Sequence, residues 1–250
     1  DHQEKKELQR KFINPELCDI TEALVYTEPY NDELKRNHVF PPIAEFVKET
    51  LYDDQELHCE VAKLKMDFMT RAQSLIHGDL HTGSVFINEE STKVFDPEFC
   101  FYGPMGYDIG NVIANMIFAW ANGDAAGAEE FCNWVENVLV DVVNMTKEKM
   151  EKYYEEHVTD TMCKNELYRK YYMATIIEDT SAVTGLELIR RIVGMANVKD
   201  ITSIEDEAKR ARAEKICITA AVDFIKNRGD KKCGKCFLGT LKDAIAKVDA

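Results

Sequence analysis

Two groups of acidic residues lie close enough along the chain to share a cation. Asp79 belongs to the polar segment HGDLHTGS at residues 77–84, and Asp96 and Glu98 flank a proline shortly afterwards. Carboxylates that are held close together repel each other unless a cation or a proton is shared between them. Mg²⁺ bound with phosphate oxygens is the usual occupant of such oxygen-rich sites. The residue types therefore indicate a metal-phosphate site.

The stretch between the two acidic groups must bring them together. Residues 85–88 and 93–96 are rich in strand-forming side chains and flank the polar turn at 89–92, which predicts a β-hairpin. A hairpin places the residue before its first strand close to the residue after its second. We therefore expect Asp79 and Asp96 to lie within about one small-ligand diameter of each other.

The remainder of the chain is predicted to be helical. In residues 55–73, apolar side chains recur every three or four positions, and residues 13–42 are expected to be irregular because they contain four prolines. The other expected helices span residues 3–12, 107–121, 125–144, 146–157, 164–182, 184–194, 204–227 and 238–248. The predicted fold class is mainly α with a small β-hairpin (α+β), without internal repeats.

Composition excludes several classes of function. The 250 residues carry 31 basic and 45 acidic side chains, so a net charge of −14 disfavours nucleic acid and anionic lipid as partners. The longest apolar stretch, residues 112–121, is shorter than the roughly 20 residues that a membrane span needs. The start of the chain lacks the apolar core of a signal peptide, and the eight cysteines suit reduced thiols. We therefore expect a cytoplasmic protein.

The acidic segments also carry a family resemblance. The motif HGDLH at 77–81, followed by Asp96 17 residues after Asp79, resembles the catalytic and metal loops of protein-kinase-like small-molecule phosphotransferases, the aminoglycoside phosphotransferase superfamily. Residues 77–110 resemble more narrowly the S-methyl-5-thioribose kinase family of methionine salvage, as do residues 16–22 and 185–194. This resemblance covers the chain from about residue 8 to about residue 228.

One departure from the broader kinase pattern supports the narrower resemblance. Ser84 stands where kinases carry an Asn that binds a second metal ion, and a hydroxyl is the weaker Mg²⁺ ligand. Asp96-Pro97-Glu98 replaces the usual Asp-Phe-Gly and so adds a carboxylate. This combination is similar to that of the methylthioribose kinases.

The resemblance implies a role for each matched residue. Asp79 would be the catalytic residue that contacts the sugar substrate and deprotonates its hydroxyl. Asp96 and Glu98 would bind the Mg²⁺, or another hard divalent cation, that bridges the phosphates of ATP. Arg190 and Arg191 would bind the substrate, although adjacent helical residues point about 100° apart, so at most one of them need face it.

His81 and Ser84 would belong to the cofactor-binding side, where they would adjust the conformation of the loop. The implied reaction converts ATP and 5-methylthioribose to ADP and 5-methylthioribose 1-phosphate, and the family also implies a homodimer. The resemblance thus describes residues 1–250 as the helical C-terminal lobe of a kinase-like fold, with its catalytic and metal loops within residues 75–110.

The ATP-binding N-terminal lobe of such kinases is not recognisable in this sequence. That lobe supplies a Gly-rich loop and a strand-borne lysine, whereas the first 77 residues contain no glycine and Lys63 and Lys65 lie within a helical pattern. We therefore interpret the chain as a fragment with negligible turnover when it is alone. Two alternatives remain, a kinase of the same fold acting on choline, homoserine or an aminoglycoside, and a non-catalytic interaction module.

Several other residues can be explained by structural roles. His77 and His81 could bind zinc, but no further ligands stand at suitable spacing, which favours structural loop histidines. Asp108 is expected to brace the catalytic loop or cap a helix. Without the resemblance, the arginine pair would be read as a solvated helix face. Cys233 and Cys236 form a single C-x-x-C pair that we predict to lie in a mobile polar turn.

Overall fold

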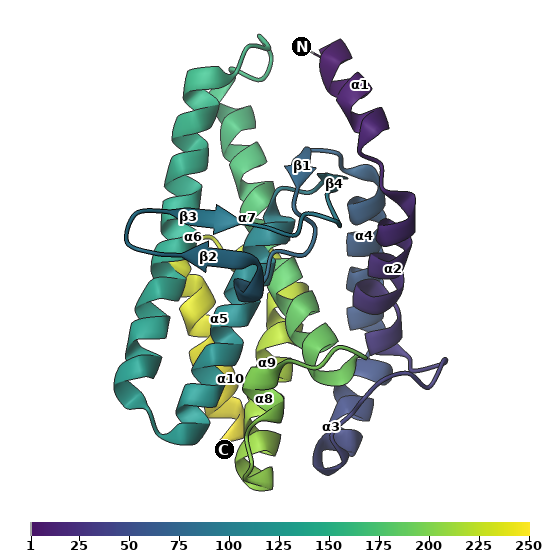
Figure 1. Cartoon of the computed structure of the whole chain (residues 1–250), viewed down its shortest axis with the longest axis vertical. Coiled ribbons are helices and arrows are strands. Elements are labelled where there is room, and N and C mark those ends of the chain that lie inside the picture. Colours follow the sequence, from purple (N-terminus) through teal and green to yellow (C-terminus); the bar gives the residue numbers. More distant parts are fainter. Residues whose placement is uncertain (1) are drawn as a thin grey trace.

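The protein is a bundle of helices that carries two very small sheets on one side (Figure 1). The structure, a computed structural model, describes residues 2–250, with side chains from residue 4. Its helices are α1 (His2–Lys11), α2 (Pro15–Tyr26), α3 (Ala44–Val47), α4 (Gln55–Thr70), α5 (Gly106–Ala126), α6 (Glu129–His157), α7 (Glu166–Val193), α8 (Lys199–Thr202), α9 (Glu207–Lys226) and α10 (Gly234–Val248). Its strands are β1 (Ser74–Ile76), β2 (Val85–Ile87), β3 (Thr92–Val94) and β4 (Phe101–Gly103). None of the described helices combines the length and apolar composition needed to cross a bilayer.

The predicted hairpin is confirmed, and a second sheet accompanies it. Strands β2 and β3 pair antiparallel, with Val85 opposite Val94. Strands β1 and β4 also pair antiparallel, with Ile76 opposite Phe101. Neither β1 nor β4 is among the elements predicted from the sequence, because three-residue strands carry almost no periodicity. The polar segments that follow β1 and β3 therefore lie between the two sheets.

Helix α7 forms the centre of the bundle. It packs against α5 on one side and α9 on another, and its residues from Asp179 to Ile189 are buried without interruption. Glycines allow these close approaches. A Cβ on Gly110 of α5 would lie 2.7 Å from the Cβ of Val183, and a Cβ on Gly185 of α7 would lie 2.4 Å from the carbonyl oxygen of Ala221. The positions of α5 and α7 are thereby fixed relative to each other.

Three expectations about helices were wrong. Residues 13–42 are not wholly irregular, because Pro15 occupies the first turn of α2, where a missing N–H costs nothing. Most of the two segments expected at 125–144 and 146–157 forms the single helix α6, since neither glycine nor proline occurs between residues 129 and 157. The segments expected at 164–182 and 184–194 likewise form one helix, α7.

Two buried hydroxyls of α7 form their hydrogen bonds within the helix. The hydroxyls of Thr180 and Thr184 each donate to the carbonyl four residues earlier, at 2.8 Å, so these polar side chains are satisfied within the buried helix.

A fourth correction concerns the C-x-x-C pair. Because α10 begins at Gly234, Cys236 lies in a helical first turn and not in a mobile polar turn.

The crossing of α5 and α7 predicts the effect of adding one methyl group. Gly110→Ala places a Cβ within 3 Å of backbone and side-chain atoms of α7, so we expect the free energy of unfolding to fall by about 1–3 kcal/mol. Gly239→Ala is the matched control, because no atom lies within 4 Å of its Cβ position in α10. It should stabilise by up to about 1 kcal/mol through helix propensity. Urea denaturation measures both, and equal effects would contradict the close crossing.

Candidate active site

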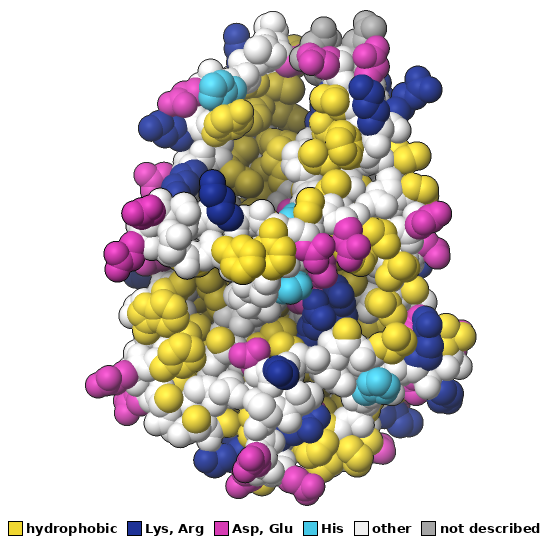
Figure 2. Space-filling view, in the orientation of Figure 1, with side chains coloured by type: hydrophobic (Ala, Val, Ile, Leu, Met, Phe, Trp, Pro, Cys, Tyr) yellow, Lys and Arg dark blue, Asp and Glu magenta, His cyan; other side chains and the backbone are white. Residues whose placement is uncertain are grey.

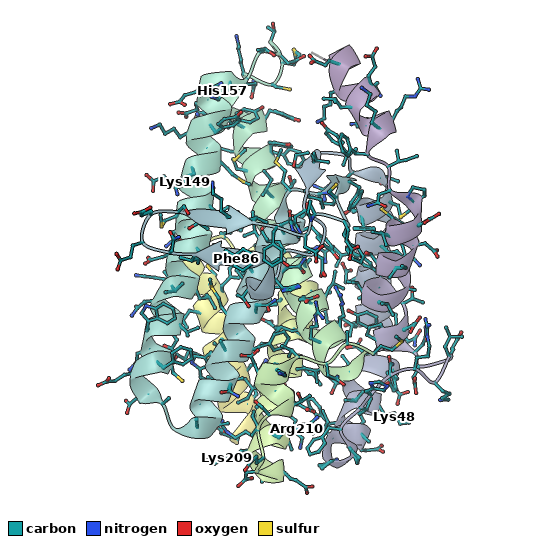
Figure 3. The ribbon with its side chains drawn as sticks, in the orientation of Figure 1. Lys48, Phe86, Lys149, His157, Lys209 and Arg210 are labelled. Atoms are coloured by element: carbon teal, nitrogen blue, oxygen red, sulfur yellow. The ribbon has the colours of Figure 1, made fainter. Side chains whose placement is uncertain are left out.

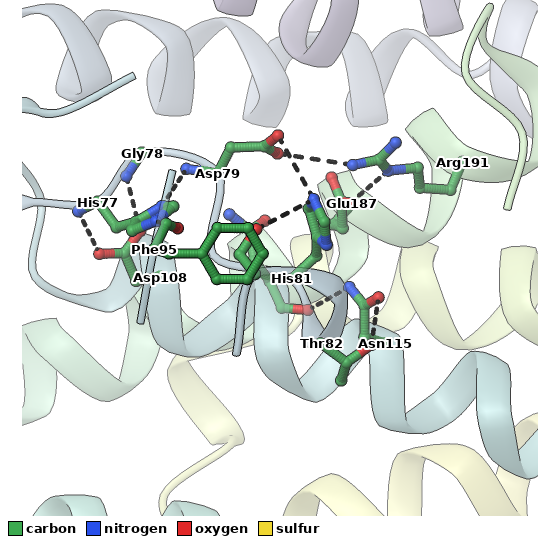
Figure 4. A network of polar contacts seen from close by, with 12 residues as sticks. His77, Gly78, Asp79, His81, Thr82, Phe95, Asp108, Asn115, Glu187 and Arg191 are labelled. Atoms are coloured by element: carbon green, nitrogen blue, oxygen red, sulfur yellow. Dashed lines mark hydrogen bonds and ion pairs between the residues drawn. The ribbon is translucent and has the colours of Figure 1, made fainter. Parts of the chain in front are cut away.

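The loop that follows β1 is held by one buried carboxylate. The backbone N–H groups of His77 and Gly78 donate to the two oxygens of Asp108, at 2.7 and 2.9 Å (Figure 4). Burial raises the pKa of Asp108, and these hydrogen bonds to its charged form act in the opposite direction. Asp108 lies in the first turn of α5 but makes no capping bond to that helix. Its predicted brace of the catalytic loop is confirmed, and its alternative role as a helix cap is not observed.

Gly78 allows this loop to approach the segment that carries the other carboxylates. Its φ of 84° lies in the left-handed region that favours glycine. A Cβ at this position would lie 2.3 Å from the carbonyl oxygen of Phe99. The His-Gly-Asp sequence therefore needs its glycine for both backbone conformation and space.

His77 links the two acidic segments. Its Nε2 donates to the carbonyl oxygen of Phe95 at 2.9 Å, which leaves Nδ1 to accept the N–H of Asp79 at 3.4 Å. The N–H of Phe95 in turn donates to the carbonyl oxygen of Ser84 at 3.1 Å. Because Phe95 directly precedes Asp96, these contacts bring the segments together as the hairpin predicted, and His77 acts as a structural loop histidine.

Asp96 and Glu98 present their side chains to solvent. Asp96 has a φ of 66°, a conformation that few residues other than glycine adopt and that concentrates at functional sites. The segment is tied down by Asn14, whose side-chain amide donates to the carbonyl oxygens of Glu98 at 2.8 Å and Cys100 at 3.1 Å. The loop is therefore fixed while its carboxylates stay accessible.

The chemistry of these two carboxylates suits a hard cation. Mg²⁺ is usually held by one or two carboxylates together with substrate phosphates and water, rather than by a cage of protein ligands. Within the described part of the chain, no group of three or more His, Cys, Asp or Glu side chains is arranged to hold a metal ion. Asp96 and Glu98 thus fit a cation that arrives with a phosphate ligand.

Both arginines of the predicted pair reach Asp79. Nη1 of Arg190 and Nη2 of Arg191 each lie 3.5 Å from Oδ1 of Asp79. The contact of Arg191 is drawn in Figure 4. Both reach the same carboxylate because the long arginine side chains bridge the angle between adjacent helical positions. The arginines come from the last turn of α7, so the central helix contributes directly to the site.

A residue that the sequence analysis missed orients both arginines. Glu187 is 1 % exposed, and its oxygens accept from Nη1 of Arg190 at 3.2 Å and from Nε of Arg191 at 2.7 Å. Burial acts to lower the pKa of Arg190, but the carboxylates of Glu187 and Asp79 outweigh it and the net shift is upward. The sequence does contain a sign of this role. Glu187 precedes Arg190 and Arg191 by three and four residues, a spacing that places side chains next to each other on a helix.

His81 and Ser84 lie beside Asp79. The Ser84 hydroxyl, almost fully buried, is 3.3 Å from Nε2 of His81, and that nitrogen is 3.9 Å from Oδ2 of Asp79. Thr82, which follows His81, donates its hydroxyl hydrogen to the side-chain oxygen of Asn115 in α5 at 3.4 Å. The whole segment after β1 is thus anchored on α5.

A large hollow lies apart from Asp79, the second acidic loop and the arginine pair. Its volume is about 1030 Å³, and it is lined mainly by apolar and aromatic side chains from β1, α6 and α7. Figure 2 shows it near the top of the molecule, where hydrophobic side chains line its walls. It includes Asp108 but none of Asp79, Asp96, Arg190 or Arg191. The hairpin face is also open, and Phe86 on it is exposed (Figure 3). Its ring stacks on that of Phe95 at 4.4 Å between ring centroids.

The helical fold, the braced His-Gly-Asp loop and the second acidic loop are together typical of the kinase-like phosphotransferase class. Comparison with known families agrees, since residues 9–137 match the phosphotransferase enzyme family. The chain belongs to this family. The matched residues include both acidic loops, while the arginine pair lies beyond them.

Known relatives extend the similarity over most of the chain. Methylthioribose kinase 1 of Oryza sativa subsp. japonica is 36% identical over 243 residues, which cover 90% of this chain and 56% of the relative. The methylthioribose kinase of Erwinia tasmaniensis is 39% identical over 253 residues, which cover 100% of this chain and 59% of the relative. That of Escherichia coli is 34% identical, with coverages of 90% and 57%. The chain therefore spans little more than half the length of these relatives.

The brace on the catalytic loop predicts a stability effect. Asp108→Ala leaves two N–H groups without their acceptor, so we expect the free energy of unfolding to fall by about 2–4 kcal/mol. Asp108→Asn retains one acceptor oxygen and should lose less. Asp141→Ala, an exposed position on α6, is the control. Urea denaturation of the three variants tests the order, and an Asp108→Ala variant as stable as Asp141→Ala would rule out the brace.

Proposed function

We propose that this chain carries the catalytic and sugar-binding residues of a kinase that phosphorylates S-methyl-5-thioribose. The reaction transfers the γ-phosphoryl group of ATP to the 1-hydroxyl and yields S-methyl-5-thioribose 1-phosphate and ADP, a step of methionine salvage. The observation that carries the proposal is the convergence of Asp79 and both arginines on a loop braced by Asp108. The names of the relatives supply the substrate.

Asp79 would act as the general base. Its side chain is about a fifth exposed, so a sugar hydroxyl could reach it, and the arginines hold its carboxylate in place. The hydroxyl proton would pass to this carboxylate as the sugar oxygen bonds to the γ-phosphorus, while the bond to the leaving ADP breaks. Holding the hydroxyl in line with the phosphoryl group is the main contribution that such a residue makes.

Arg190 and Arg191 would bind the sugar and stabilise charge on the transferring phosphoryl group. Glu187 is buried against both guanidinium groups, so their orientation is fixed before a ligand arrives. Planar guanidinium groups suit this task because their N–H donors match phosphate and hydroxyl oxygens. Pre-orientation lowers the entropy that binding must overcome.

The nucleotide would lie on the side of Asp96 and Glu98. Asp96 and Glu98 would hold a divalent cation, Mg²⁺ in our proposal, which would supply the positive charge that the phosphates of ATP require. Ser84 and His81 would support this side by fixing the loop between Asp79 and the hairpin. The exposure of the two carboxylates leaves room for cation-bound phosphates and water.

One prediction of this proposal concerns how much of the chain is needed for kinase activity. Residues 1–77 contain no glycine for a phosphate-binding loop, so we expect residues 1–250 alone to turn over negligibly. A fusion that places the amino-terminal part of the rice methylthioribose kinase before residue 1 should phosphorylate methylthioribose when ATP and Mg²⁺ are supplied. The measurement is ADP release together with detection of the sugar phosphate.

The same assay separates the alternatives. Choline, homoserine and an aminoglycoside are offered in parallel, and a preference for one of them would replace methylthioribose as the substrate. A correctly folded fusion that phosphorylates none of the four favours an interaction module. Turnover by residues 1–250 alone would overturn the interpretation of the chain as a fragment.

Another prediction of this proposal concerns Asp79, the proposed general base. In the active fusion, Asp79→Asn preserves shape but cannot accept the proton, so kcat should fall by about 10²–10⁴-fold. The KM for ATP should stay unchanged because Asp79 is assigned to the sugar. Asp141→Asn serves as the surface control. An Asp79→Asn variant with undiminished kcat would remove Asp79 from the mechanism.

A further inference from the structure

Two cysteines outside the candidate active site lie in contact with each other. Cys233 directly precedes α10, and Cys236 lies in the first turn of that helix. Their sulfur atoms are 3.0 Å apart, and both side chains are partly accessible. A disulfide requires an S–S distance of about 2.05 Å, so the two sulfurs need to approach by only about 1 Å.

The surrounding structure holds this pair firmly. Gly234, between the cysteines, donates its N–H to the side-chain oxygen of Asn144 in α6 at 2.9 Å. A Cβ on Gly234 would lie 2.3 Å from the carbonyl oxygen of Val140, so α10 begins directly against the backbone of α6. The preceding loop is anchored by Lys231, which pairs with Asp223 of α9 at 2.5 Å. The sulfurs are therefore presented by a fixed helix terminus.

The Cys236 thiol differs in its pKa from the buried cysteines. The Cys233 thiol, the backbone N–H groups of Lys232 and Cys233 and the Lys231 ammonium together lower the pKa of Cys236, although burial opposes them. In contrast, burial raises the pKa of the thiols of Cys18, Cys132 and Cys217. A thiol with a lowered pKa at a helix N-terminus is the usual setting of thiol–disulfide exchange.

Metal binding is the less favoured use of the pair. A structural zinc site needs four ligands, and no cluster of three or more potential ligands exists among residues that the structure describes. A disulfide needs only two sulfur atoms, and two thiols in contact supply both. The observations therefore favour redox chemistry over zinc.

We propose that Cys233 and Cys236 are a reversible redox site that exchanges with small disulfides such as oxidised glutathione. The thiolate of Cys236 attacks one sulfur of the small disulfide, forms a mixed disulfide and releases one thiolate, which takes up a proton. Cys233 then loses its proton and attacks the sulfur of Cys236, which releases the second thiol. The two cysteines are oxidised to one disulfide and the small disulfide is reduced to two thiols.

The test follows the disulfide by peptide mapping of the full chain. The protein is equilibrated with mixtures of reduced and oxidised glutathione, quenched with acid, alkylated and cut with trypsin. Cleavage after Lys235 separates the two cysteines, so a disulfide joins two peptides that reduction releases. We expect this linked pair to accumulate as the share of oxidised glutathione rises. Cys59, an exposed cysteine in another helix, is the internal control and should carry only bound glutathione.

Single variants test the order of attack. Cys233→Ser should trap glutathione on Cys236, whereas in Cys236→Ser the remaining Cys233 should react about tenfold more slowly. Circular dichroism confirms that each variant folds. The proposal is overturned if Cys233 and Cys236 are alkylated as freely as Cys59 at every ratio. Accumulation of mixed or intermolecular disulfides alone in the wild-type chain would also overturn it.

Discussion

The geometry of the candidate site depends on the pair of hydrogen bonds from the loop after β1 to Asp108. Three-residue strands cannot hold a loop by themselves, and the buried carboxylate supplies what they lack by fixing two consecutive N–H groups. His77 then directs its ring at Phe95, and Asp79 follows in a defined direction. One side chain at the start of α5 thereby positions both acidic segments.

This brace is useful only because α5 is itself fixed. The close crossing at Gly110 locks α5 against α7, and the last turn of α7 carries the arginines that reach Asp79. Two residues far apart in the sequence, Asp108 and Glu187, therefore hold the two halves of one cluster from two helices of the same packed pair. A shift of either helix would separate Asp79 from the guanidinium groups, so the bundle core and the site share one constraint.

The sequence alone was sufficient where the determinants are local. The hairpin, the His-Gly-Asp loop and most helix positions follow from nearby residues. Pro15 was misleading because a proline in the first turn of a helix starts that helix and does not break it. The pairing of β1 with β4 and the role of Glu187 depend on contacts that the fold creates. The start of α10 at Gly234 depends on packing against Val140, which no local pattern encodes.

The distribution of charge suggests how the two sides of the site would differ in the proposed kinase. On the sugar side, two guanidinium groups face the carboxylates of Asp79 and Glu187, so charges balance and the arrangement is stable without a ligand. On the nucleotide side, Asp96 and Glu98 are exposed, and no basic side chain forms an ion pair with them among the described contacts. Two solvated carboxylates are tolerable in water, but become costly once a nucleotide excludes that water. In the proposed kinase a cation would therefore accompany the phosphates. The sugar side would be preformed, whereas the nucleotide side would be completed by its ligand.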